Sequence, residues 1–174
     1  MNYIFKLYSI VSASIFFACF LSFSVNAQTE WNLKKDKDGI AVYTAKLEDS
    51  KFKSIRVVCE FQGSLSQLVS ILMQPNLQPE WVLATKQASL VKQISSARLY
   101  YYAEAALPWP MSNRDMVIDL SMSQHPITKL LTIHANTIDN ILPVKEGKQR
   151  VPISQATWLV QPLPDNKISI DYQI

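Results

Sequence analysis

The stretch Leu107-Pro-Trp-Pro-Met-Ser-Asn-Arg-Asp115 places two prolines, a tryptophan and an arginine–aspartate pair between two segments that both have the pattern of β-strands. Pro108 and Pro110 fix their own φ angles and disfavour a helical conformation for the residues before them. The flanking segments, 98–106 and 113–124, are rich in aromatic and aliphatic residues. The sequence therefore predicts a rigid corner that joins two neighbouring strands and carries ionisable side chains.

Outward from this corner the chain is mostly strand. Further strands are predicted at residues 40–43, 51–61, 86–94, 128–139, 150–161 and 166–174, with a turn at Asp38-Gly39. In the last segment, Ile168, Ile170, Tyr172 and Ile174 alternate with polar residues. Such alternation is typical of antiparallel strands with one buried and one solvated face.

One amphipathic helix is predicted ahead of most of these strands. Ser64 and Gln67 have the spacing of a capping box, and the apolar residues of 65–73 recur on one helical face. Pro75 ends the helix, and a short irregular piece follows from Asn76 to Trp81. The fold class is therefore α+β, with an antiparallel sheet and a short helix in the N-terminal half.

The apolar face of this sheet needs a cover, and the helix at 65–73 is too short to supply all of it. Two explanations stay open, separately or together. Part of the face lines a ligand cavity, or the sequence is incomplete after Ile174.

Residues 1–27 have the layout of a secretory signal peptide, with Lys6 before a long apolar run and small residues before a cleavage position ahead of Gln28. The alternative is an uncleaved membrane anchor, because the apolar run is long. The mature domain then spans residues 28–174 and is exported, to the periplasm or outside the cell.

Composition excludes several classes of protein. A formal net charge of +3 for the whole chain is too small for a nucleic-acid-binding surface. Three glycines in all do not allow a phosphate-binding loop, and no cofactor is predicted. His125 and His134 lack the further ligands of a metal site. Cys59 alone remains after residue 27, so no intrachain disulfide forms; its reactivity is left open.

Four stretches together resemble the START family, the lipid-transfer domains related to the steroidogenic acute regulatory protein. They are Trp31 with Asp38-Gly-Ile-Ala-Val-Tyr43, then Lys51 to Arg56 with the capped helix after it, then Trp81, and finally Tyr101-Tyr102 with Pro108-Trp-Pro-Met-Ser-Asn-Arg-Asp-Met-Val117. The resemblance extends from Trp31 to the end of the chain.

The resemblance implies a helix-grip fold, in which a curved antiparallel sheet grips a long C-terminal helix around a hydrophobic tunnel for one lipid. It therefore implies a lipid ligand, transient membrane contact and no enzymatic activity. Because the chain ends where the C-terminal helix should begin, that helix is absent and the sequence is predicted to be a fragment or a shortened gene product.

The predicted lipid-binding residues are those that the strand pattern and the resemblance place in the tunnel: Tyr100, Tyr102, Glu104, Arg114, Met116, Ile118 and Trp158. Glu104 and Arg114 flank the corner and are expected to face each other, either holding a lipid headgroup or forming a structural ion pair. Asp115 is expected on the opposite, solvated face. Sterol-binding members of the family carry a second cavity arginine, where this chain has Leu120, so a phospholipid or another acyl lipid is favoured over a sterol.

Two other functions stay open. The same cavity could belong to a cyclase-like or hydrolase-like enzyme, with Glu104 as its titratable group. If no closing helix exists, the exposed sheet edge could instead bind another protein. The sequence does not indicate an oligomeric state.

Overall fold

The computed structural model describes residues 29–47 and 50–174, so the predicted signal peptide lies outside the described residues. The strands are β1 (Asn32–Lys37), β2 (Ile40–Lys46), β3 (Lys53–Gln62), β4 (Thr85–Ser95), β5 (Arg98–Ala105), β6 (Asn113–Gln124), β7 (Leu131–Thr137), β8 (Lys148–Arg150), β9 (Gln155–Leu163) and β10 (Lys167–Gln173). The helices are α2 (Leu65–Leu72), the 3-10 helix η1 (Pro75–Leu77) and α3 (Gln78–Trp81).

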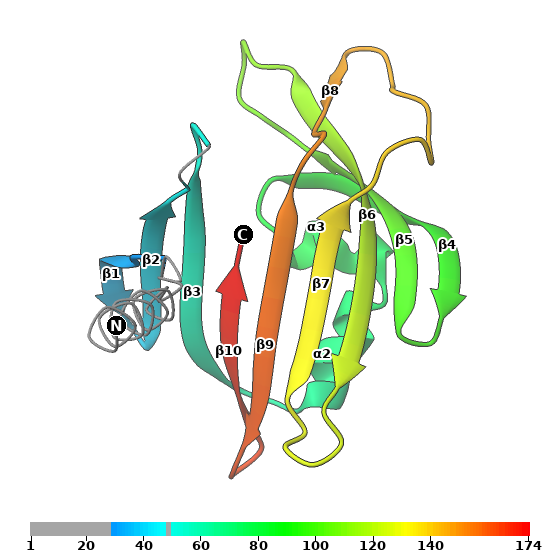
Figure 1. Cartoon of the computed structure of the whole chain (residues 1–174). Coiled ribbons are helices and arrows are strands. Elements are labelled where there is room, and N and C mark those ends of the chain that lie inside the picture. The colour runs from blue at the N-terminus through cyan, green and yellow to red at the C-terminus, as the bar shows by residue number, and fades with distance from the viewer. Residues whose placement is uncertain (1–28, 48–49) are drawn as a thin grey trace, which may run out of the picture.

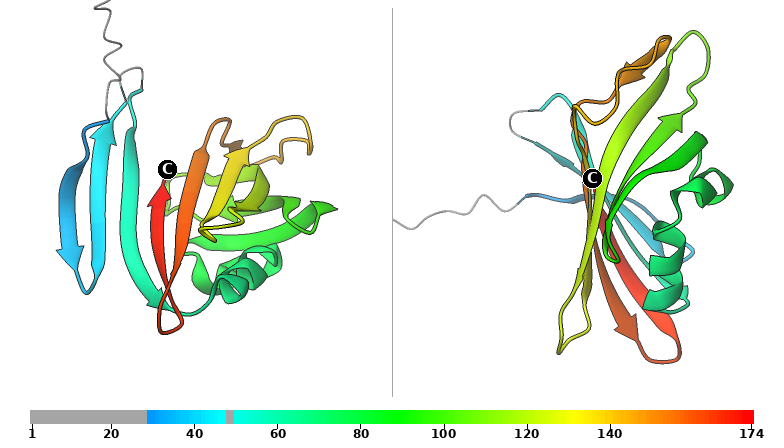
Figure 2. Two further views of the ribbon diagram at one scale, coloured as in Figure 1. Left: turned by 60° about the horizontal axis from the view of Figure 1, so that its bottom comes forward. Right: turned by 90° about the vertical axis from the view of Figure 1, so that its right-hand side faces the viewer.

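All the strands form one curved sheet in the order β1-β2-β3-β10-β9-β7-β6-β5-β4 (Figure 1). Neighbours along this order are antiparallel, and β8 joins the sheet by parallel pairing with β6. The helices all lie on one face, which we call the concave face, and the opposite face is the convex face (Figure 2). The predicted α+β, helix-grip-like fold is confirmed, and no helix follows β10 in the described chain.

The first hairpin depends on a turn that only permissive residues can form. Asp38 and Gly39 both have positive φ angles, 54° and 76°. A tight turn in this conformation has a backbone twist that matches the right-handed twist of the two strands it joins. The turn was predicted, but β1 was not. All six of its residues are exposed, so it has no apolar alternation that could reveal a strand.

The capping box at the start of α2 is confirmed. The Ser64 hydroxyl accepts a hydrogen bond from the Gln67 backbone N–H at 3.3 Å, and the Gln67 side chain accepts one from the Ser64 N–H at 2.8 Å. Leu72 at the end of α2 is buried against the concave face. The segment predicted to be irregular after Pro75 is helical instead, as η1 and α3, because proline is tolerated in the first turn of each.

The strand predicted at 150–161 is in fact two strands with different partners. β8 pairs with the start of β6, and β9 pairs with β7 and β10. Pro152 lies in the break, and its ring removes the N–H that a continuous ladder would need. The 138–154 segment, which contains β8, thus connects β7 to β9.

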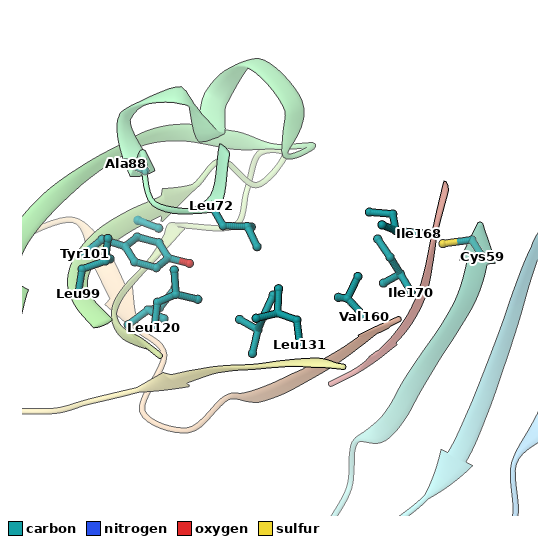
Figure 3. Close-up of a cluster of buried hydrophobic side chains, with 13 residues drawn as sticks. Cys59, Leu72, Ala88, Leu99, Tyr101, Leu120, Leu131, Val160, Ile168 and Ile170 are labelled. Carbon is teal, nitrogen blue, oxygen red and sulfur yellow. The ribbon is translucent and has the colours of Figure 1, made fainter. Parts of the chain in front are cut away.

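The hydrophobic core lies between the concave face and the helices. Leu99, Ile133 and Val160 have no exposed surface, and Leu72 approaches them from α2 (Figure 3). The alternation predicted for the last strand is confirmed, because Ile168 and Ile170 are buried in the same cluster.

Truncating Ile133 should be costly, because it removes three methyl or methylene groups from a fully buried site on a central strand. Ile133→Ala is expected to lower the free energy of unfolding by about 2–5 kcal/mol. Ile127→Ala is the matched control, because Ile127 is 83 % exposed in the turn before the same strand, and about 0.5 kcal/mol or less is expected there. Urea unfolding of both variants measures the difference, and equal effects would contradict this account of the core.

Candidate functional site

A cavity of about 330 Å³ lies between the concave face and the helices. Its walls come from α2, α3 and the segment after it, and from β5, β6, β7, β9 and β10. Apolar lining residues include Leu72, Tyr101, Ala103, Met116, Ile118, Leu120, Ile133, Ala135, Ala156 and Trp158. Leu83 also borders the cavity and is 97 % exposed, so the cavity reaches the surface beside α3.

A wider groove of about 1060 Å³ continues on the other side of the interior, between α2 and strands β3 and β10. Trp81 and Trp158 border both spaces, so the cavity and the groove are neighbours. In Figure 3 the side chains of Leu72, Val160 and Ile168 point toward this common interior from α2, β9 and β10. The concave face therefore offers a long apolar surface that the helices cover only in part.

The uncharged polar side chains that line the cavity include Gln78, Tyr101 and Tyr172, besides Thr85, Thr137 and Ser154. Burial raises the pKa of the Tyr101 hydroxyl, and hydrogen bonding with the Gln78 side chain opposes that rise. Burial also raises the pKa of Tyr172, with the neighbouring Tyr101 adding to the effect. Both phenols therefore stay neutral. The rings of Tyr172 and Trp158 pack edge to face, with their centroids 5.1 Å apart.

The structure brings together three of the predicted lipid-binding residues. Met116 and Ile118 on β6 and Trp158 on β9 all line the cavity. Tyr100 and Tyr102 do not, because they lie on the convex face of β5 and the cavity is lined by Tyr101 and Ala103 instead. Their predicted orientation was therefore wrong by one residue, and a one-residue error in a strand turns every side chain to the other face.

The expected pairing of Glu104 with Arg114 is also wrong. Glu104 is opposite Asp115, and Arg114 is opposite Ala105 on the other face of the sheet. The Glu104 carboxylate binds Lys148 of β8 and accepts a hydrogen bond from the Asn113 side chain at 2.8 Å. The Arg114 guanidinium donates to the Ser112 carbonyl at 2.9 Å. Glu104 borders the cavity, but its charge is neutralised on the convex side.

Asp115 was expected on the solvated face, but it is fully buried. Arg150 of β8 donates to both of its carboxylate oxygens, at 2.9 and 3.0 Å, and also to the carbonyls of Leu142 and Pro143. Bidentate bonding of this kind, with further hydrogen bonds to the cation, offsets the free-energy cost of removing both charges from water.

Lys148 and Arg150 are the residues that the sequence analysis missed. They occupy alternate positions of a three-residue strand, so both point to the same side of it. Lys148 reaches Glu104 on β5, and Arg150 reaches Asp115 on β6. The available signal was two cations two residues apart, in a chain with carboxylates on two neighbouring predicted strands. The sequence alone does not reveal the parallel pairing of β8 with β6, so it does not show that these cations reach those carboxylates.

The 138–154 segment is thereby fastened over the convex face. Besides the two ion pairs, the Lys145 ammonium lies 3.9 Å from the centre of the buried Tyr102 ring. Thr137, which directly precedes this segment, and Ser154, its last residue, line the cavity on the other side of the sheet. The ion pairs therefore set the position of one end of the cavity wall.

Other chemistry has little support in the described part of the chain. No group of three or more histidine, cysteine, aspartate or glutamate side chains is placed to hold a metal ion among residues 29–47 and 50–174. Burial raises the pKa of the Cys59 thiol, which disfavours the reactive thiolate.

Comparison with known proteins supplies the relatives of this chain. A family model described as START domain matches residues 24–170. The uncharacterized protein PA1579 of Pseudomonas aeruginosa is 26 % identical over 145 residues, covering 83 % of this chain and 71 % of that protein. The crystal structure of a STAR-related lipid transfer protein (fragment 25-204) from Xanthomonas axonopodis superposes with a TM-score of 0.77 at 26 % identity, covering 82 % of this chain and 79 % of that one. Human STARD10 shares the fold, with a TM-score of 0.71 at 18 % identity over 85 % of this chain and 61 % of its own.

The Glu104 ion pair should appear in the pH dependence of stability. Hydrogen bonding to Lys148 is the main reason that the pKa of Glu104 lies at about 2, below the usual 4.5. A carboxylate whose pKa is lower in the folded than in the unfolded chain stabilises the fold above its unfolded pKa. That contribution should be lost as the pH falls from about 4.5 to about 2. Over this range, the free energy of unfolding of Glu104→Gln is expected to fall less than that of the wild type, as measured by urea unfolding at several pH values.

The matched control is Glu60→Gln, on an exposed position of β3. It should keep the wild-type slope between pH 4.5 and pH 2. A wild-type slope in Glu104→Gln would contradict the assignment.

Proposed function

The chain belongs to the START domain family, and from this premise we propose that it binds one hydrophobic lipid, a phospholipid or another acyl lipid, between its sheet and its helices and carries that lipid between membranes. The observation that carries the proposal is the cavity on the concave face. The similar Xanthomonas protein is described as a lipid transfer protein, which supports the same function here.

The chemistry of the cavity suits an acyl chain. Its volume of about 330 Å³ falls in the range of ligand sites, and its lining is mostly aliphatic and aromatic. Each methylene group that leaves water for such a space contributes roughly 0.8 kcal/mol. The neighbouring groove of about 1060 Å³ would extend the path for a longer chain or a second acyl chain. Met116 can adapt its shape to an irregular ligand.

Transfer requires contact with a bilayer, and one end of the molecule is suited to it. Leu83, Trp109, Val144 and Ile153 are 66–97 % exposed and lie in connections at one end of the sheet. We call these four residues the apolar end. In Figure 1 the β5–β6 corner and the 138–154 segment lie together at the top, and the Ala106 N–H donates to the Ala84 carbonyl, which places Leu83 beside them. Since Leu83 also borders the cavity, lipid would enter and leave at this end.

The N-terminal 27 residues would direct export, so the lipid would be carried in the periplasm or outside the cell. Among the residues that the structure describes, no helix has the length and apolarity needed to cross a bilayer. A non-enzymatic role fits the site better than a cyclase or hydrolase, because Glu104, the titratable group on which the enzyme interpretation depended, is bound to Lys148 on the convex side.

Filling the cavity should block binding. Ala135→Phe adds a ring inside the cavity and is expected to weaken the binding of a neutral solvatochromic dye, Nile red, at least tenfold, because the dye and the ring compete for the same space. His134→Phe is the control, since His134 is exposed on the opposite face of the same strand. Fluorescence titration gives both affinities, and lipid extracted from each purified protein is identified by mass spectrometry. Equal affinities in the two variants, or no dye bound by the wild type, would contradict the proposal that this cavity holds the lipid.

Removing the apolar end should slow transfer without weakening binding. The double variant Trp109→Ala and Ile153→Ala is expected to transfer a fluorescent phospholipid between vesicles several-fold more slowly than the wild type, while its Nile red affinity stays unchanged. Ile127→Ala removes an equally exposed residue from the hairpin turn between β6 and β7, away from the apolar end. If Ile127→Ala slows transfer as much as the double variant does, the apolar end has no special part in docking.

A further inference from the structure

The described part of the chain has three buried polar or charged side chains besides its tyrosines: Gln78, Glu104 and Asp115. Glu104 and Asp115 are neutralised by Lys148 and Arg150 on the convex side of the sheet. Gln78 differs from both. It is 93 % buried, it is uncharged, and it borders the cavity on the concave side. An amide there needs hydrogen-bond partners, because an unsatisfied buried amide group costs free energy.

The neighbours of Gln78 are also uncharged. Tyr101 lies beside it on β5, and Tyr172 borders the same cavity from β10. Figure 3 shows the hydroxyl oxygen of Tyr101 pointing into the interior, on the side of Leu72. A Gln78 side chain has two N–H donors and one acceptor oxygen, so one tyrosine hydroxyl cannot satisfy it fully.

No basic side chain borders the cavity in the described residues. Of the nearby cations, Lys148 and Arg150 are bound to carboxylates on the convex side. Arg114, on the concave face of β6, is not part of the cavity lining and donates to the Ser112 carbonyl. An ionised carboxylate or phosphate inside this cavity would therefore lose its hydration without gaining a cation. A hydroxyl or carbonyl oxygen would lose much less and could bond to Gln78, Tyr101 and Tyr172.

Building on the proposed lipid-binding function, we propose that Gln78, Tyr101 and Tyr172 form a neutral polar subsite that hydrogen-bonds an uncharged oxygen group of the ligand, a hydroxyl or an ester or amide carbonyl. The subsite selects lipids whose polar group within the cavity carries no charge. An ionised headgroup remains outside, toward the apolar end.

The first test compares ligands of equal chain length. Displacement of Nile red from the purified full-length protein at pH 8 is measured with 1-hexadecanol, methyl palmitate and sodium palmitate. Hexadecanol and methyl palmitate are expected to displace the dye at concentrations at least tenfold lower than palmitate, which is ionised at this pH. Palmitate competing as well as hexadecanol would overturn the proposal.

The second test uses variants that keep the shape of the cavity. Tyr101→Phe, Tyr172→Phe and Gln78→Met are each expected to weaken hexadecanol binding about fivefold, the effect of one lost hydrogen bond. The affinity for diphenylhexatriene, a hydrocarbon dye with no hydrogen-bonding atom, is expected to change by a smaller factor in each variant. Tyr100→Phe is the matched control, because it removes a hydroxyl from the convex face of the same strand, and no change is expected.

The ratio of hexadecanol to diphenylhexatriene affinity separates recognition of the hydroxyl from damage to the cavity. If all three variants keep the wild-type ratio, the subsite does not exist, although the lipid-binding proposal can still stand on Nile red and acyl-lipid binding. If the wild type binds neither the dye nor any of the three lipids, the proposed function fails and the subsite fails with it.

Discussion

The register between β5 and β6 is the constraint on which the rest of the structure depends. Glu104 is opposite Asp115, so the two strands turn Tyr101, Ala103, Met116 and Ile118 to the concave face. The same register turns both carboxylates to the convex face, where they are buried. A shift by one residue would turn one of the two strands over, which would place its carboxylate inside the apolar cavity and its apolar side chains outside. The ion pairs with β8 therefore also oppose any other register of this hairpin.

The convex face explains how a thin sheet can keep one end of its cavity wall in place. A sheet that is covered by helices on one face only has no second layer to hold its connections. Here the 138–154 segment supplies that layer locally, with Lys148 and Arg150 bound to the sheet and Lys145 over the Tyr102 ring. Because Thr137 and Ser154 line the cavity, a fastening on one face positions groups on the other. The buried carboxylates and their cations lie on the convex side, and the cavity on the concave side is lined mostly by apolar and neutral polar side chains.

Much of the fold could be predicted because local pattern and global fold agree there. The alternation of Ile168, Ile170 and Tyr172 and the capping box at Ser64 are each sufficient to assign an element. β1 has no buried face, and β8 is three residues long, so neither has enough pattern to identify it. The strand pattern at 98–106 fixes which residues alternate, but Tyr100, Tyr101 and Tyr102 are consecutive, so the pattern does not say which of them point inward. That choice depends on the register with β6, which is a property of pairing rather than of either strand.

The same reasoning explains why Met116, Ile118 and Trp158 were placed in the cavity and Glu104 was given the wrong partner. On β6 and β9 the more apolar of the two faces turns inward, although Val117 and Leu159 break strict alternation, so hydrophobic burial determines the inward face. For a charged residue, burial is determined by which cation reaches it, and both cations come from a segment 44 and 35 positions along the chain. An arginine close in sequence, Arg114, suggested a simpler pair than the fold allows. Long-range pairing thus decides where the charges lie, and the placement of charge decides which ligands the apolar interior can accept.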